Sequence, residues 1–153
     1  MNRREFFKAF VSLSKKELLR PPYAKGEFYD CSGCEAPCME ACETGIISLA
    51  KDGSPYLSFS KGGCTFCGEC AKACPKGVLS LSSSERIRAL VRINPKVCGA
   101  WQGVLCFSCK EPCLDNAIKF EGLGKPVILQ DRCTSCGFCV STCPAGAIEV
   151  VPL

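Results

Sequence analysis

Residues 64–75 read CTFCGECAKACP, and residues 133–144 read CTSCGFCVSTCP. Each stretch places four cysteines in eleven residues, separated by two, two and three residues, with a proline after the fourth. Three thiolates so close together can face one inorganic cluster only if the backbone curls around it, and Gly68 and Gly137 ease that curl. The proline fixes φ and turns the chain away. Both stretches therefore predict metal-cluster sites.

This spacing is typical of 4Fe–4S proteins of the bacterial ferredoxin type. In such proteins three cysteines of a run bind one cluster, and the fourth binds the other cluster of a pair. Structural zinc usually takes two C-x2-C pairs that lie far apart in sequence. Zinc is therefore the minor alternative for these two stretches, which form the second and fourth cysteine units of the chain.

Two further groups of four cysteines depart from this spacing. The first unit has gaps of two, three and three residues, and the third has gaps of seven, two and three. We expect Trp101, in the seven-residue gap, to cover an otherwise open loop. The sixteen cysteines divide into four groups of four, so we expect four 4Fe–4S clusters, with a 3Fe–4S centre at the first unit as the alternative. The candidate ligands are Cys31, Cys34, Cys38, Cys42, Cys64, Cys67, Cys70, Cys74, Cys98, Cys106, Cys109, Cys113, Cys133, Cys136, Cys139 and Cys143.

Composition narrows the function classes. A chain of 153 residues makes one domain or two very small ones. Histidine is absent, which excludes imidazole bases, histidine triads and mixed Cys/His zinc sites. Gly122-Leu123-Gly124 lacks the rest of a dinucleotide motif. We therefore expect an electron carrier or an accessory maturation protein rather than an enzyme.

The four units recur along the chain, each followed by a short apolar tail. We expect an α+β fold of two tandem bacterial-type 2×(4Fe–4S) ferredoxin-like halves, residues 24–89 and 90–153, after a basic arm over residues 1–23. Hairpins should pair 46–49 with 56–59 and 118–120 with 127–129, because turn-forming residues separate these runs. A helical turn over 85–90 should join the halves. The tail residues expected to pack over the clusters are Ile46, Val78, Ile118 and Ile148.

Two pairings of the units are open: one with two and three with four, or one with four and two with three. Gaps of 21 and 19 residues, each with an expected hairpin, favour the sequential pairing. The polar gap through residues 82–84 fits a join between halves. The expected ligand sets are Cys31, Cys34, Cys38 with Cys74; Cys64, Cys67, Cys70 with Cys42; Cys98, Cys106, Cys109 with Cys143; and Cys133, Cys136, Cys139 with Cys113.

Charge is concentrated at the N-terminus. Residues 1–25 hold seven basic and two acidic side chains, whereas the other 128 hold twelve and thirteen. Arg3-Arg4 resembles a twin-arginine export signal, but the apolar run that follows is short and interrupted by Lys15-Lys16. We therefore expect a cytoplasmic protein, whose cysteines bind metal rather than form disulfides. No apolar run is long enough to span a membrane, and no basic stripe interleaved with aromatics indicates nucleic-acid binding.

Several of these features together resemble the NapF family, the ferredoxin-type proteins of periplasmic nitrate reductase systems. The resemblance rests on the four units with the seven-residue gap in the third, the paired arginines, Arg20-Pro21-Pro22-Tyr23 and 109–113 (CKEPC). The extra residue between Cys34 and Cys38 departs from the family pattern. The resemblance implies a redox protein partner: the molybdenum-containing catalytic subunit of nitrate reductase, contacted in the cytoplasm before export. It implies a role in maturation or redox loading of that subunit. The alternative is an electron-transfer subunit of another multi-subunit oxidoreductase.

Overall fold

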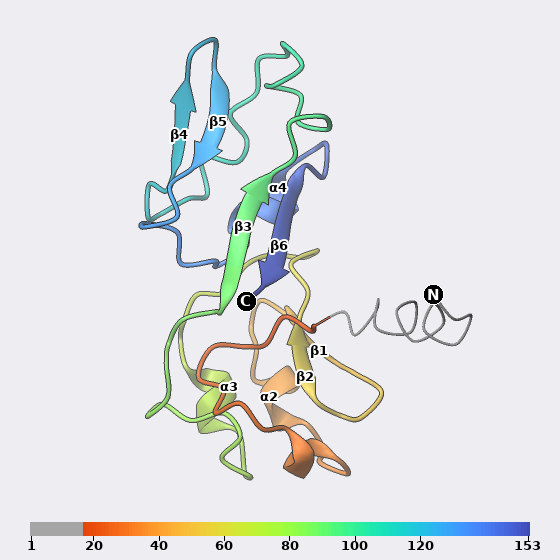
Figure 1. Cartoon of the computed structure of the whole chain (residues 1–153). Helices are drawn as coiled ribbons and strands as arrows, with labels where there is room; N and C mark the ends of the chain where they lie inside the picture. The colour runs from red at the N-terminus through yellow and green to blue at the C-terminus, as the bar shows by residue number, and fades with distance from the viewer. Residues whose placement is uncertain (1–16) are drawn as a thin grey trace, which may run out of the picture.

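The computed structural model describes residues 17–153, and the paired arginines lie outside this range (Figure 1). Regular secondary structure is sparse, and no helix among these residues exceeds five residues. No helix in this part of the chain has the length and apolar character needed to cross a membrane. The helices are η1 (Tyr29–Cys31, a 3-10 turn), α2 (Pro37–Glu40), α3 (Glu69–Lys72) and α4 (Phe138–Thr142).

The strands form three separate antiparallel pairs. Strand β1 (Ile47–Leu49) pairs with β2 (Pro55–Leu57), and β4 (Ile118–Glu121) pairs with β5 (Lys125–Ile128). Both expected hairpins are therefore confirmed, although β2 starts one residue earlier than predicted and β5 two residues earlier. The third pair joins β3 (Ala89–Ile93) to β6 (Ile148–Pro152), which lie between the β4–β5 hairpin and the N-terminal part in Figure 1.

The helical turn predicted over 85–90 is wrong. Residues 89 and 90 begin β3, and the preceding bend is held by Arg86 N–H, which donates to Ser84 Oγ at 3.2 Å. A strand forms here instead of a helix because Val91 and Ile93 alternate with Arg92, which places one face of β3 toward the interior. Val91 is buried against the cysteines and apolar tails of the third and fourth units.

A shorter version of this pairing occurs in the N-terminal part. Ala24 forms an isolated antiparallel bridge with Leu79. Lys25 N–H donates to Val78 O, and Ser80 N–H donates to Tyr23 O. In both parts of the chain, a segment that precedes the first cysteine unit thus pairs with the tail that follows the last.

The described portion of the basic arm is integrated into this N-terminal part. Leu57 N–H donates to Leu19 O at 2.7 Å, and Arg20 Nη1 donates to Ser54 Oγ and Pro55 O, both at 2.9 Å. The Arg20 guanidinium also lies 4.1 Å from the centre of the Phe28 ring. The segment through Tyr23 therefore packs on the fold instead of extending from it.

A left-handed residue follows the fourth cysteine of every unit by three positions. Gly45, Gly77 and Gly146 have φ between 61° and 65°, and Asn116 has φ of 49°. At each turn, the backbone N–H of this residue donates to the carbonyl of the fourth cysteine. Glycine and asparagine tolerate this conformation best, so the same turn directs all four apolar tails.

We predict that Gly146→Val will destabilise the protein by about 1–2 kcal/mol, because a β-branched residue resists positive φ. No atom lies within 4 Å of a Cβ built at Gly146, so the effect will be backbone strain rather than a clash. Thermal unfolding under anaerobic conditions measures it. Asn116→Gly at the equivalent turn should lose no stability, and equal losses in the two variants would contradict this explanation.

Candidate iron–sulfur cluster sites

The structure gathers the sixteen cysteines around four cavities, each lined by four of them. We name them pocket A (Cys42, Cys64, Cys67, Cys70), pocket B (Cys31, Cys34, Cys38, Cys74), pocket C (Cys113, Cys133, Cys136, Cys139) and pocket D (Cys98, Cys106, Cys109, Cys143).

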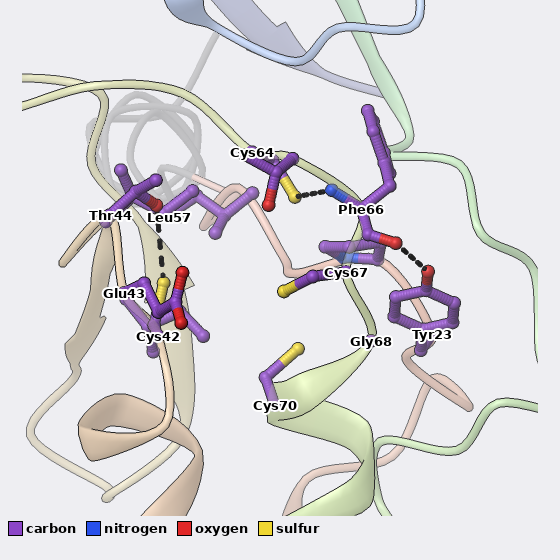
Figure 2. Close-up of a pocket in the computed structure, with 14 residues that line it drawn as sticks. Tyr23, Cys42, Glu43, Thr44, Leu57, Cys64, Phe66, Cys67, Gly68 and Cys70 are labelled. Carbon is purple, nitrogen blue, oxygen red and sulfur yellow. Dashed lines mark hydrogen bonds between the residues drawn. The ribbon is translucent and has the colours of Figure 1, made fainter.

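Each pocket combines three cysteines of one unit with the fourth cysteine of another. In pocket A, Cys42 of the first unit faces three cysteines of the second, and the four sulfur atoms surround a common space (Figure 2). In pocket B, conversely, Cys74 of the second unit joins three cysteines of the first. The structure thus brings unit one together with unit two, and unit three together with unit four, in the groupings expected from sequential pairing.

Short helices carry the third cysteine of three units. Cys38 lies in α2, Cys70 in α3 and Cys139 in α4. The residue before each helix is left-handed: Gly68 with φ of 77°, Gly137 with φ of 83°, and Ala36 with φ of 54°. The first unit has one residue more between its second and third cysteines, and its cysteines still converge on pocket B.

The third unit reaches the same arrangement without a helix. Its seven-residue loop folds back on itself, because Gln102 N–H donates to Cys98 O and Val104 N–H donates to Gly99 O. Trp101 Nε1 donates to Pro126 O at 3.0 Å, which fastens the loop to β5. The indole therefore holds the loop against the β4–β5 hairpin.

Apolar tails form one wall of each pocket. Ile46 lines pocket A, Val78 pocket B, Ile118 pocket C and Ile148 pocket D, as expected from the sequence. All four side chains are buried. These walls keep water away from the sulfur atoms and lower the local dielectric constant.

The buried thiols resist ionisation without a metal. Burial, reinforced by neighbouring cysteines, raises the pKa of Cys70 and of Cys139 to about 12. Burial also raises the pKa of Cys64 and of Cys109 to about 11. Since thiolates are the metal-binding form, cluster binding must displace these protons.

Hydrogen bonds to sulfur oppose this effect at some cysteines. Burial acts to raise the pKa of Cys42, but donors from the Thr44 hydroxyl and the Ile46 and Ile47 N–H groups lower it overall. Phe66 N–H donates to Cys64 Sγ at 3.4 Å. Ala117 N–H and Ala147 N–H donate at 3.3 Å to the sulfurs of Cys113 and Cys143. The N–H donors among them follow from the backbone curl around pockets A, C and D.

The donor sets fit 4Fe–4S clusters. Each pocket offers four thiols around an apolar cavity, and in pockets A, C and D a backbone N–H group donates to a sulfur, which is the environment that such clusters require. Within residues 17–153, no three cysteine or carboxylate side chains lie close enough to hold a single metal ion. The sulfurs instead stand apart around the cavities.

Family models match two regions of the chain. A 4Fe–4S dicluster domain matches residues 30–78, and a 4Fe–4S binding domain matches residues 126–149. The first covers the cysteines of pockets A and B, and the second covers the fourth unit. These matches establish that the chain is a 4Fe–4S protein.

Full-length relatives extend the comparison. The ferredoxin-type protein NapF of Escherichia coli K12 is 35% identical over 139 residues, which cover 85% of this chain and 82% of the relative. The chain belongs to the NapF family of ferredoxin-type proteins. The resemblance inferred from the sequence is thereby confirmed, and the chain is an iron–sulfur electron-transfer protein related to known oxidoreductase components.

Other relatives are longer proteins. The ferredoxin-type protein NapG of Haemophilus influenzae is 30% identical over 88% of this chain and 59% of the relative. One subunit of an ion-translocating oxidoreductase complex of Methanosarcina acetivorans is 39% identical over 82% of this chain and 48% of the relative. The NapF-family pattern therefore also occurs within longer proteins.

Sequence reasoning did not identify Tyr23 as a residue of the sites. Tyr23, which the sequence assigns to the arm, lines pocket A, and its hydroxyl donates to Phe66 O at 2.8 Å (Figure 2). This bond supports the left-handed backbone of Phe66, whose N–H donates to Cys64 Sγ. The sequence did contain a signal that Tyr23 joins the fold, in the run Arg20-Pro21-Pro22-Tyr23. The two prolines fix φ and so favour an extended path into the fold.

We predict that Thr44→Val will lower the reduction potential of the cluster in pocket A. The hydroxyl lies 3.5 Å from Cys42 Sγ and stabilises negative charge on that sulfur, which increases on reduction. Redox titration followed by electron paramagnetic resonance (EPR) measures the shift. Ser60→Ala, which removes an exposed hydroxyl bonded to Ser58, is the control. An unchanged potential in Thr44→Val would exclude the hydrogen bond as a determinant.

Proposed function

We propose that the chain holds four 4Fe–4S clusters, one in each of pockets A to D, and carries single electrons between protein partners. The observation that supports this most directly is the distribution of the cysteines, four to each pocket with none left over. Bound clusters supply one-electron redox chemistry, and the cysteines, apolar walls and sulfur-directed donors hold and tune them.

The proposed ligands are the four cysteines that line each pocket. With this assignment the chain consists of two tandem ferredoxin-like halves, 24–89 and 90–153, which follow the basic arm. The matching pairings Ala24–Leu79 and β3–β6 support this division, since each brings the start of a half next to its end. Residues 19–23 act with the first half through the contacts of Arg20 and Tyr23.

Metal content tests the number of clusters. We predict about sixteen iron and sixteen acid-labile sulfide per chain after anaerobic reconstitution, with the brown colour of iron–sulfur proteins. Iron and sulfide assays of the purified protein give the number of clusters, and a zinc assay in parallel tests for zinc in their place. A value near eight iron, or stoichiometric zinc, would refute the four-cluster assignment.

Paired cysteine variants test the ligand sets. Cys42→Ser and Cys67→Ser should each disturb the same EPR signal and leave about twelve iron, because both residues line pocket A. The double variant should lose no more than either single variant. Cys38→Ser, only four residues from Cys42, should disturb a different signal because Cys38 lines pocket B. If Cys42→Ser and Cys38→Ser disturb one and the same signal, the assignment is wrong.

We further propose that the protein acts in the cytoplasm on the molybdenum-dependent catalytic subunit of nitrate reductase before that subunit is exported. Membership of the NapF family supports this partner. Charge supports a protein partner generally: each oxidised cluster with four thiolates carries about −2, so the loaded body is strongly negative beside a basic N-terminal segment. Such a dipolar molecule can orient a partner as it docks.

A binding experiment tests this partner. We predict that the unexported catalytic subunit binds the full chain anaerobically and binds a variant lacking residues 1–16 at least tenfold more weakly. The deletion stops at residue 16 because Leu19 and Arg20 contribute to the fold, and unchanged iron content would verify that the fold is retained. The similarity to a subunit of an ion-translocating complex favours the alternative, another oxidoreductase. No binding by the full chain would favour that alternative.

A further inference from the structure

The loops of pockets A and C meet directly. Cys64 lines pocket A and Cys136 lines pocket C, and the Cys64 N–H donates to the Cys136 carbonyl at 2.7 Å. One candidate ligand from each half is thus in backbone contact with a candidate ligand of the other. Two segments 72 residues apart in sequence are joined at their metal-binding turns.

The contact is reciprocal and tight. A Cβ placed on Gly63 would lie 2.6 Å from both the ring and the backbone nitrogen of Phe138. A Cβ on Gly137 would overlap the ring of Phe59. Each half therefore presents a phenylalanine to a glycine of the other, and neither glycine position has room for a larger side chain.

Further contacts hold this region together. Ser135, buried in pocket C's loop, donates its hydroxyl to Ala89 O at 2.9 Å, where β3 begins. Val140 and Val150 pack against the apolar residues of both halves. We refer to Phe59, Gly63, Cys64, Cys136, Gly137 and Phe138 as the seam.

Within each half, the two pockets are linked along the chain. Cys38 of pocket B and Cys42 of pocket A lie four residues apart along one stretch of chain, and so do Cys70 and Cys74. The same four-residue spacing links pockets C and D through 109–113 and 139–143. The order of neighbours is therefore B, A, C, D, and the seam is the link between the halves.

We propose that the seam positions pockets A and C for electron exchange between the halves, so that B and D form the ends of a single four-cluster relay. This inference rests on the proposed function, because it requires a cluster in each pocket. In the exchange, a reduced cluster in one half loses one electron and an oxidised cluster in the other gains it. No bond is made or broken, and no proton moves. Gly63 and Gly137 are positioning residues that permit the close approach.

Gly63→Ala tests the proposal, because its Cβ would force the halves apart at Phe138. Gly62→Ala is the matched control from the same loop, since a Cβ there would meet only ordinary contacts at 3.9 Å. The readouts are iron per chain and the spin–spin couplings seen by EPR after full reduction with dithionite. We expect Gly63→Ala to keep the iron of the wild type and to weaken the coupling between pockets A and C measurably. The couplings within each half should remain.

A second pair of variants keeps the test decisive if Gly63→Ala fails to bind the full amount of iron. Gly137→Ala creates a clash at the seam with Phe59 of the first half. Gly146→Ala is its control, because Gly146 has a similar positive φ but open space around its Cβ. Coupling retained at full iron in a seam variant overturns the proposal. Iron loss in both seam variants but not in their controls also overturns it, by showing a folding contact only. Low iron in the wild type would instead refute the proposed function.

Discussion

The convergence of four thiolates on one small cavity is the constraint on which the rest of this structure depends. Burial raises the pKa of Cys70 and of Cys139, so these thiols keep their protons until a metal displaces them. The backbone must bring the sulfurs together through local geometry. It does so with left-handed residues before α2, α3 and α4 and three positions after each fourth cysteine. Conventional packing is thin, because the apolar clusters consist partly of the cysteines themselves.

Much of this arrangement could be predicted from the sequence, because cysteine spacing translates directly into local geometry. Glycine at 68 and 137, and apolar residues after each fourth cysteine, indicate the curl and the walls without reference to distant contacts. The sequential grouping of units was favoured by the gaps of 21 and 19 residues with their expected hairpins, but these loop lengths left nested pairing open. The hairpins followed from runs of turn residues flanked by β-formers.

Features that depend on distant contacts were not predictable. Residues 85–90 have a helical composition, but the partner that makes 89–93 a strand lies more than fifty residues away in β6. Tyr23 looks like part of a basic arm, and only the bond from its hydroxyl to Phe66 O connects it to a pocket. Gly63 carries no special φ, and only the approach of Phe138 explains why a side chain is absent there. In each case the deciding neighbour comes from another part of the chain.

The crossed arrangement of cysteines also determines the order in which the sites are completed during synthesis. Pocket A is complete once residue 70 has been made and pocket B once residue 74 has been made; pockets C and D follow at residues 139 and 143. A chain emerging from the ribosome therefore completes its pockets in two pairs, which are separated by more than sixty residues. Just before each pair is completed, the chain carries six cysteines that belong to unfinished pockets. Oxygen can oxidise such exposed thiols. The connectivity itself thus leaves thiols open to oxidation until later residues are made, independently of how stable the finished fold is.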